Sequence, residues 1–174
     1  MLTYEEARGS IDTGDIVFVA HGSSLVSRLT ELATRSSFFH VGIAVWLRDA
    51  AFESRLFIVE AHQGGRRIVS LSSYANYPLT IVSSEVPFSA YSDALMERVG
   101  SVPYGYLDYI SIGLRELLHI KVGDFKGEVC SEMVARHLNM GGLYLPTLLS
   151  PAKLFRRLTV EMGWAVKLAT TWTD

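Results

Sequence analysis

The stretch Phe38-Phe39-His40-Val41-Gly42-Ile43-Ala44-Val45 places a histidine and a glycine inside an otherwise apolar run. Its aromatic and β-branched composition predicts a β-strand that is largely buried. A buried imidazole costs free energy unless it is hydrogen-bonded, so His40 needs a polar partner. Gly42 faces the same side as His40, and a glycine within a strand often marks the close approach of a ligand or another element.

The next strand along the chain offers that partner. Residues 55–61 are strand-like, and Glu60 is a carboxylate near the end of this β-branched run. If residues 39–47 and 55–61 form a hairpin, the numbers of paired residues sum to about 100, which places His40 opposite Glu60. A slip of two residues keeps the pair on one face as diagonal neighbours, whereas a slip of one separates it. Glu60 could then orient the imidazole, although a purely structural role is open for each residue.

The chain contains a single cysteine, in Glu128-Val129-Cys130-Ser131-Glu132-Met133-Val134. It cannot form an intrachain disulfide, so it is either a small buried hydrophobe or a reactive thiol. Residues 121–127 are irregular and contain glycine, and the pattern after Cys130 is helical as far as Gly141-Gly142. We therefore expect Cys130 at the first turn of a helix, where unpaired N–H groups and the helix dipole stabilise a thiolate.

The remaining segments place strands mainly in the first half of the chain and helices in the second. Strands are expected at residues 16–20, 38–47, 55–61, 67–71 and 79–84, and helices at 23–36, 89–99, 106–118, from Cys130 onward and from Ser150-Pro151 onward. This order predicts an α+β fold with an antiparallel β-sheet packed with helices. A length of 174 residues with 49% apolar residues fits one ordered domain.

Composition argues against several classes of partner. The net charge is −2, from 16 basic and 18 acidic residues, which disfavours a nucleic-acid-binding protein. The basic spots at Arg66-Arg67 and at residues 153–157 are expected on a solvated surface. The longest apolar run, residues 41–47, is too short to cross a bilayer, and residues 1–14 lack the apolar core of a signal peptide. We expect no integral membrane segment and a cytoplasmic location as encoded.

Four further histidines are possible partners of the thiol: His21, His62, His119 and His137. His21 directly follows a strand, and His119 ends an amphipathic helix. His137 lies about two turns after Cys130 on the same helix, so it cannot easily reach back. The histidines lack the tight spacing of metal ligands, and one cysteine cannot build a structural zinc site. We expect no metal and no other cofactor.

The order of the motifs resembles that of a known family. A Gly-Asp pair and an apolar strand (residues 14–20) precede His40-Val41-Gly42-Ile43 and Val59-Glu60-Ala61. Pro103-Tyr104-Gly105-Tyr106-Leu107-Asp108-Tyr109 and Val129-Cys130-Ser131-Glu132 follow. This order is similar to the circularly permuted branch of the NlpC-type papain-like superfamily, close to the YiiX-like group, in which the histidine strand precedes the cysteine helix. The resemblance covers about residues 14–154.

The resemblance implies a single permuted papain-like catalytic domain over residues 1–174. It implies a cysteine peptidase or amidase in which Cys130 is the nucleophile, His40 the general base and Glu60 the orienting residue. His62 could substitute for Glu60. The backbone N–H of Cys130 could donate to the oxyanion. Further oxyanion and substrate candidates are His21, Gly22, Ser23, His62 and Tyr104.

The substrate that the resemblance implies is a short peptide, such as a cell-wall (peptidoglycan) stem peptide. Delivery to the cell wall would then need another route, as for a phage-encoded enzyme. Related permuted proteins transfer fatty acyl groups between lipids, so lipid acyltransferase or phospholipase-like chemistry through the same thioester is an alternative. A binding module without turnover is a further alternative.

Overall fold

The computed structural model describes residues 4–20, 38–48, 53–62, 65–100 and 129–170. The helices predicted at residues 23–36 and 106–118 lie outside these ranges. The same holds for five residues singled out above, His21, Gly22, Ser23, Tyr104 and His119.

The described strands form a six-stranded sheet in the order β4-β3-β2-β1-β5-β6, and all neighbours are antiparallel. The strands are β1 (Ile16–Ala20), β2 (Phe38–Arg48), β3 (Ser54–His62), β4 (Gly65–Ser70), β5 (Leu79–Val82) and β6 (Val166–Thr170). The helical elements are α1 (Tyr4–Arg8), η1 (Leu71–Tyr74), η2 (Phe88–Ala90), α3 (Ser92–Glu97), α5 (Cys130–Met140), α6 (Pro151–Arg156) and η3 (Arg157–Glu161). The predicted α+β architecture with an antiparallel sheet is confirmed.

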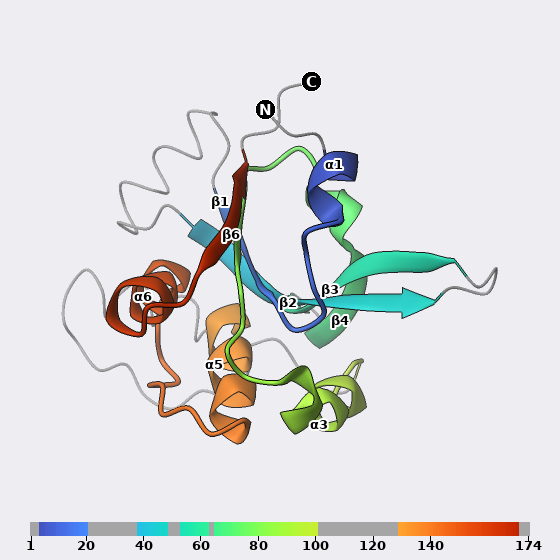
Figure 1. Cartoon of the computed structure of the whole chain (residues 1–174). Coiled ribbons are helices and arrows are strands. Elements are labelled where there is room, and N and C mark those ends of the chain that lie inside the picture. Colours follow the sequence, from blue (N-terminus) through green and yellow to red (C-terminus); the bar gives the residue numbers. More distant parts are fainter. Residues whose placement is uncertain (1–3, 21–37, 49–52, 63–64, 101–128, 171–174) are drawn as a thin grey trace.

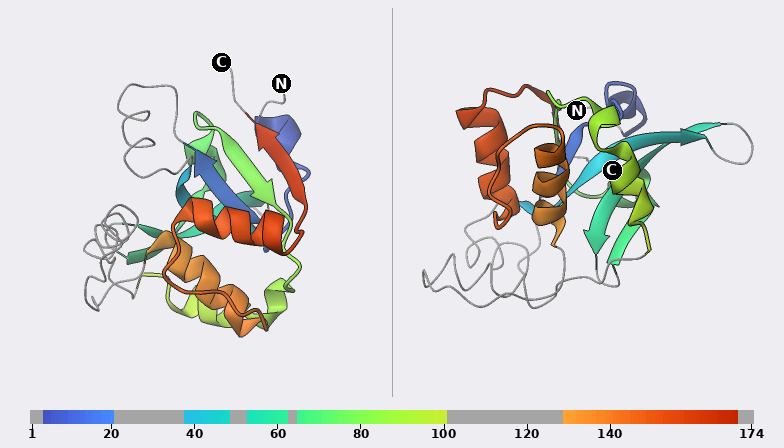
Figure 2. Two further views of the ribbon diagram at one scale, coloured as in Figure 1. Left: turned by 90° about the vertical axis from the view of Figure 1, so that its left-hand side faces the viewer. Right: turned by 90° about the horizontal axis from the view of Figure 1, so that it is seen from below.

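Helices cover the two faces of the sheet unequally (Figure 1). One face packs against α3, α5 and α6, and its core includes Ile43 and Val59 together with Met133 and Leu138 of α5. The other face is covered by α1 and η1, through Ala7 and other residues of a second apolar cluster. Figure 2 shows α5 and α6 lying together on the first face. Because both faces are covered, residues 16–19 of β1 are all fully buried, which explains why this strand is continuously apolar.

The hairpin of β2 and β3 has a register that differs from the simplest expectation. Ala44 pairs with Ile58 and Ile43 with Val59, so paired numbers sum to 102 rather than 100. The prediction that His40 lies directly opposite Glu60 is therefore wrong, and the register slipped by two residues is the one that forms. Since this slip preserves the face of every side chain, His40 and Glu60 remain on one side as diagonal neighbours.

A β-bulge lies directly beside His40. Val19 of β1 pairs with His40, whereas Ala20 pairs with Phe38, so Phe39 is an additional residue in β2. Phe38 packs against the first apolar cluster and Phe39 against the second. Bulges bend a strand locally and re-aim the side chains next to them. The bulge thereby sets the direction of the imidazole at this end of β2.

The described helices partly follow the predictions. α5 begins at Cys130, and α6 begins at Pro151 with the Ser150 hydroxyl accepting the Lys153 N–H. The helix predicted at residues 89–99 is instead a 3₁₀ turn, η2, followed by the shorter α3. β6 was not predicted. It is an edge strand with Val166 exposed, and its pattern is too short to stand out.

Replacing Gly42 by alanine is expected to lower the free energy of unfolding by roughly 1–3 kcal/mol, because the added methyl group would overpack the site. A Cβ atom there would lie 2.6 Å from Ile58 Cγ1 and 2.8 Å from the Val59 carbonyl oxygen, and backbone cannot easily move aside. Urea unfolding measures the change. Gly9→Ala is the matched control, since no atom lies within 4 Å of its Cβ position. Equal stability of the two variants would contradict the close packing of β3 on Gly42.

Candidate active site

Glu60 is the most completely hydrogen-bonded side chain of the site, and it is fully buried in β3. Its Oε2 accepts from His40 Nε2 at 2.7 Å and from the Tyr74 hydroxyl at 2.8 Å. Its Oε1 accepts from Arg67 Nε at 2.8 Å and forms an ion pair with Arg67 Nη2 at 2.8 Å. Burial acts to raise the pKa of this carboxyl, but its bond to His40 and the bonds to Tyr74 and Arg67 hold the pKa below its usual value. Glu60 is therefore a carboxylate at neutral pH.

His40 lies between Glu60 and Cys130. Burial alone would lower the pKa of the imidazole, but hydrogen bonding and charge from Cys130 and Glu60 outweigh it and raise the pKa to about 9. Because a carboxylate only accepts, Nε2 donates its proton to Glu60. Nδ1 is the nitrogen that remains for the thiol of Cys130. The arrangement fixes both the tautomer and the orientation of the ring.

Aromatic rings hold the imidazole in place. The Tyr74 ring stacks on His40 with centroids 5.7 Å apart and planes inclined by 21°. Phe39 stacks nearby, with centroids 6.4 Å apart. Burial, and then the charge and hydrogen bond of Glu60, raise the pKa of Tyr74, so its hydroxyl stays protonated and donates. Tyr74 therefore contacts both the base and the residue that orients it.

Cys130 is the first residue of α5 and is buried in the apolar cluster between the helix and the sheet. The first backbone bond of the helix runs from Met133 N–H to Val129 C=O. The N–H groups of residues 130–132 precede it and have no partner inside the helix. The Ser131 hydroxyl donates to the Leu149 carbonyl oxygen and ties this turn to the segment before α6.

Arg66 departs from its predicted place on a solvated surface. Its side chain is only 1% exposed, and Nη1 donates to the carbonyl oxygens of Ala94 and Leu95 at 3.2 and 3.1 Å. The same nitrogen donates to His137 Nε2 at 3.2 Å. A guanidinium cannot accept, so His137 carries its proton on Nδ1 and donates it to Met133 C=O at 2.6 Å. His137 thus links α5 to β4, away from the thiol.

The structure brings together His40, Glu60 and Cys130, the three residues that sequence reasoning assigned to one site. His62 lies beside them, with its ring edge-on to His40 and centroids 6.5 Å apart, while Glu60 occupies Nε2. Arg67 and Tyr74 were missed. Arg67 had a detectable signal, because it pairs with Glu60 across β3 and β4, where opposite charges stabilise each other. No local pattern marks Tyr74, which reaches the site from η1.

Two structural features bear on cofactors and membranes. Within the described ranges, no three histidine, cysteine or acidic side chains are grouped so that they could hold a metal ion. Among the helices that the structure describes, none has the length and apolarity needed to cross a bilayer.

Comparison with known proteins gives a similarity of fold. No protein-family model matches the chain, and no curated protein matches it. Among solved structures, the chain is similar to the crystal structure of the metalloprotein yiiX from Escherichia coli O157:H7, with a TM-score of 0.51 and 17% sequence identity. The match covers 94% of this chain and 99% of the other. At this level of identity the likeness concerns the fold alone. At that level it agrees with the predicted resemblance to the YiiX-like group.

Proposed function

We propose that this protein is a thiol-dependent hydrolase with a permuted papain-like, NlpC-type architecture. The observation that carries the proposal is the imidazole of His40, which is held between the buried Glu60 carboxylate and the Cys130 thiol. A nucleophile, a base within its reach and a third group that orients the base are the parts of a catalytic triad. The described residues supply all three from β2, β3 and the start of α5.

In the proposed mechanism His40 takes the proton of Cys130, or the two rest as an ion pair, and the raised pKa of His40 favours the protonated ring in either case. The thiolate attacks the carbonyl carbon of an amide, and the oxyanion accepts the Cys130 backbone N–H. The C–N bond then breaks as His40 gives its proton to the leaving amine, which leaves a thioester on Cys130. Neutral His40 next takes a proton from water, and the hydroxide releases the acid and restores the thiolate.

The expected substrate is a short peptide such as a peptidoglycan stem peptide. This substrate class comes from the resemblance of the motif order to the papain-like superfamily, and it extends beyond the chemistry of the triad. Acyl transfer to a lipid would use the same thioester with a different acceptor. Product analysis separates these chemistries: incubation with muropeptides releases new amines and carboxylates under the proposal, whereas incubation with phospholipids yields transferred acyl chains under the alternative.

The alkylation rate of Cys130 with iodoacetamide tests the site without knowledge of the substrate. At pH 6 we expect wild type to react at least tenfold faster than His40→Ala, because an ordinary thiol, with a pKa near 8.5, is almost fully protonated there. His62→Ala is the matched control and should keep the wild-type rate. Intact mass and peptide mapping confirm that the label is on Cys130. Equal, slow rates in all three proteins at pH 6 would refute the activated thiol.

A further inference from the structure

A second polar site lies on the face of the sheet that α1 and η1 cover. It is a pocket of about 290 Å³ between α1, the start of β3 and the junction of β4 with η1. This volume lies just below the roughly 300–1,000 Å³ typical of pockets for small molecules, which favours a small ligand. The inference does not rest on the proposed thiol chemistry.

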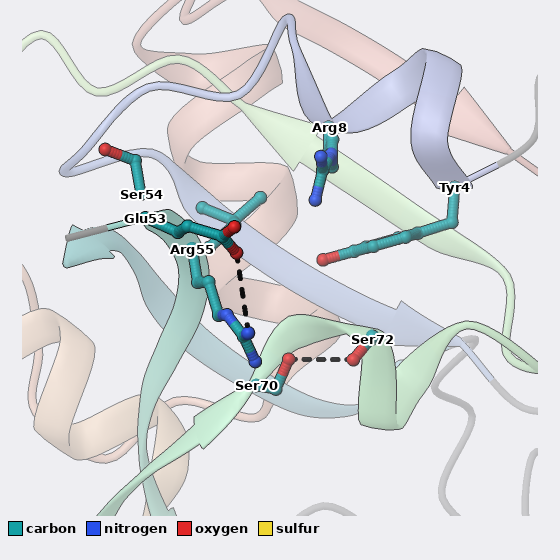
Figure 3. Close-up of a pocket in the computed structure, with 8 residues that line it drawn as sticks. Tyr4, Arg8, Glu53, Ser54, Arg55, Ser70 and Ser72 are labelled. Carbon is teal, nitrogen blue, oxygen red and sulfur yellow. Dashed lines mark hydrogen bonds and ion pairs between the residues drawn. The ribbon is translucent and has the colours of Figure 1, made fainter. Parts of the chain in front are cut away.

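Hydrogen-bond donors converge on this pocket from four elements, α1, β3, β4 and η1 (Figure 3). The Arg8 guanidinium and the Tyr4 hydroxyl extend into it from α1, and Arg55 extends from β3 toward Ser70. On the wall formed by β4 and η1, the hydroxyls of Ser70 and Ser72 lie 2.7 Å apart. The lining as a whole combines two guanidinium groups with four hydroxyls, those of Tyr4, Ser54, Ser70 and Ser72.

The pocket has a net positive charge. Two arginines face one carboxylate, Glu53, which lies 3.6 Å from Arg55. The Arg55 and Glu53 side chains are 59% and 71% exposed, and ion pairs between such exposed groups are weak and easily displaced. An anion that contacts both arginines can therefore compete with Glu53 for the Arg55 guanidinium.

We propose that this pocket binds the phosphate group of a small phosphomonoester. A tetrahedral phosphate presents several acceptor oxygens in different directions, which suits donors that arrive from separate elements. Guanidinium groups bind phosphate through charge-assisted and often bidentate hydrogen bonds, and the serine and tyrosine hydroxyls can donate as well. The Tyr4 ring provides apolar surface for the organic part of the ligand.

Isothermal titration calorimetry with phenyl phosphate and with inorganic phosphate, at constant ionic strength in chloride, tests the site. We expect saturable 1:1 binding, tighter for phenyl phosphate. Arg8→Gln and Arg55→Gln should each weaken binding at least tenfold, because each removes a charged donor. Glu53→Gln should tighten it, since it removes the competing carboxylate. Arg156→Gln, an exposed arginine on α6 beyond the other face, changes the net charge equally and should leave the affinity unchanged.

Three results would overturn the proposal. These are the absence of saturable binding by wild type, an equal loss of affinity in Arg156→Gln and the two pocket variants, and benzoate binding as tightly as phenyl phosphate. The last result would assign the pocket to carboxylates instead. Thermal unfolding in chloride checks that each variant is folded, and the opposite effect expected of Glu53→Gln cannot arise from a loss of folding.

Discussion

Replacing Cys130 by alanine is expected to abolish amide hydrolysis, with kcat/KM falling by roughly 10⁴-fold or more, the loss seen when a catalytic triad lacks its nucleophile. The physical reason is that no other described side chain can form the acyl intermediate at this position. The oxyanion donor and the base would remain, and alone they provide little rate. The measurement is the initial rate of amine release from a muropeptide that wild type has been shown to cleave.

The matched control is Ser131→Ala, one residue further along α5. Its hydroxyl bonds to Leu149 C=O rather than to the imidazole, so this variant should keep activity within about tenfold while losing some stability. Cys130 is buried among apolar side chains, and its own replacement by alanine should leave the fold intact. Hydrolysis by Cys130→Ala at the rate of wild type would show that the reaction does not pass through a thioester.

Replacing Glu60 by glutamine is expected to lower the free energy of unfolding by about 3 kcal/mol at pH 5.5, since it removes one member of a buried charged network. The fully buried carboxylate accepts from His40, Tyr74 and Arg67 through its two oxygens. A glutamine amide has one accepting oxygen and a donating NH₂ group, so it cannot accept all of these bonds. Urea unfolding of both proteins gives the difference. The exposed pair of Glu161 with Arg157 supplies the control, and Glu161→Gln should cost less than about 1 kcal/mol.

The difference in the free energy of unfolding between wild type and Glu60→Gln should have a maximum and should decrease at lower and at higher pH. The pKa of Glu60 is lowered in the folded state, so its contribution is present above the ordinary value of 4.5 and is lost as the pH falls through the folded pKa. The pKa of His40 is raised to about 9, so its contribution is complete below 6.5 and is lost as the pH rises toward 9. The difference is therefore largest between pH 4.5 and 6.5. A difference that stays constant from pH 3 to 9 would contradict this coupling.

Several parts of the fold were accessible from local sequence patterns. The strands β1, β2 and β3 follow from runs of apolar and β-branched residues, and the starts of α5 and α6 follow from changes of pattern at Cys130 and at Ser150-Pro151. The shared face of His40 and Glu60 was also predictable. Side chains alternate along a strand with a period of two, so any even slip of the hairpin preserves that face.

Other features depend on contacts between distant segments. The register of β2 and β3, and the bulge at Phe39, result from packing both faces of the sheet rather than from the composition of either strand. Burial of Arg66 requires α3 to present the carbonyl oxygens of Ala94 and Leu95, and α5 to present His137, to the same guanidinium. A pair of arginines looks like solvated surface in a linear chain, because nothing local indicates which polar groups the fold will bring to it.

For the candidate site, the sequence alone determined which residue types are present and on which element each lies: a thiol at a helix start, and an imidazole and a carboxylate on one face of a hairpin. Only the tertiary structure decided that the thiol reaches the imidazole, and that Arg67 and Tyr74 complete the bonds of Glu60. Cys130 and His40 are far apart along the chain, and their approach depends on how α5 packs on β2 and β3. Local periodicity carries no information about such packing, because it is set by the fit of two apolar surfaces.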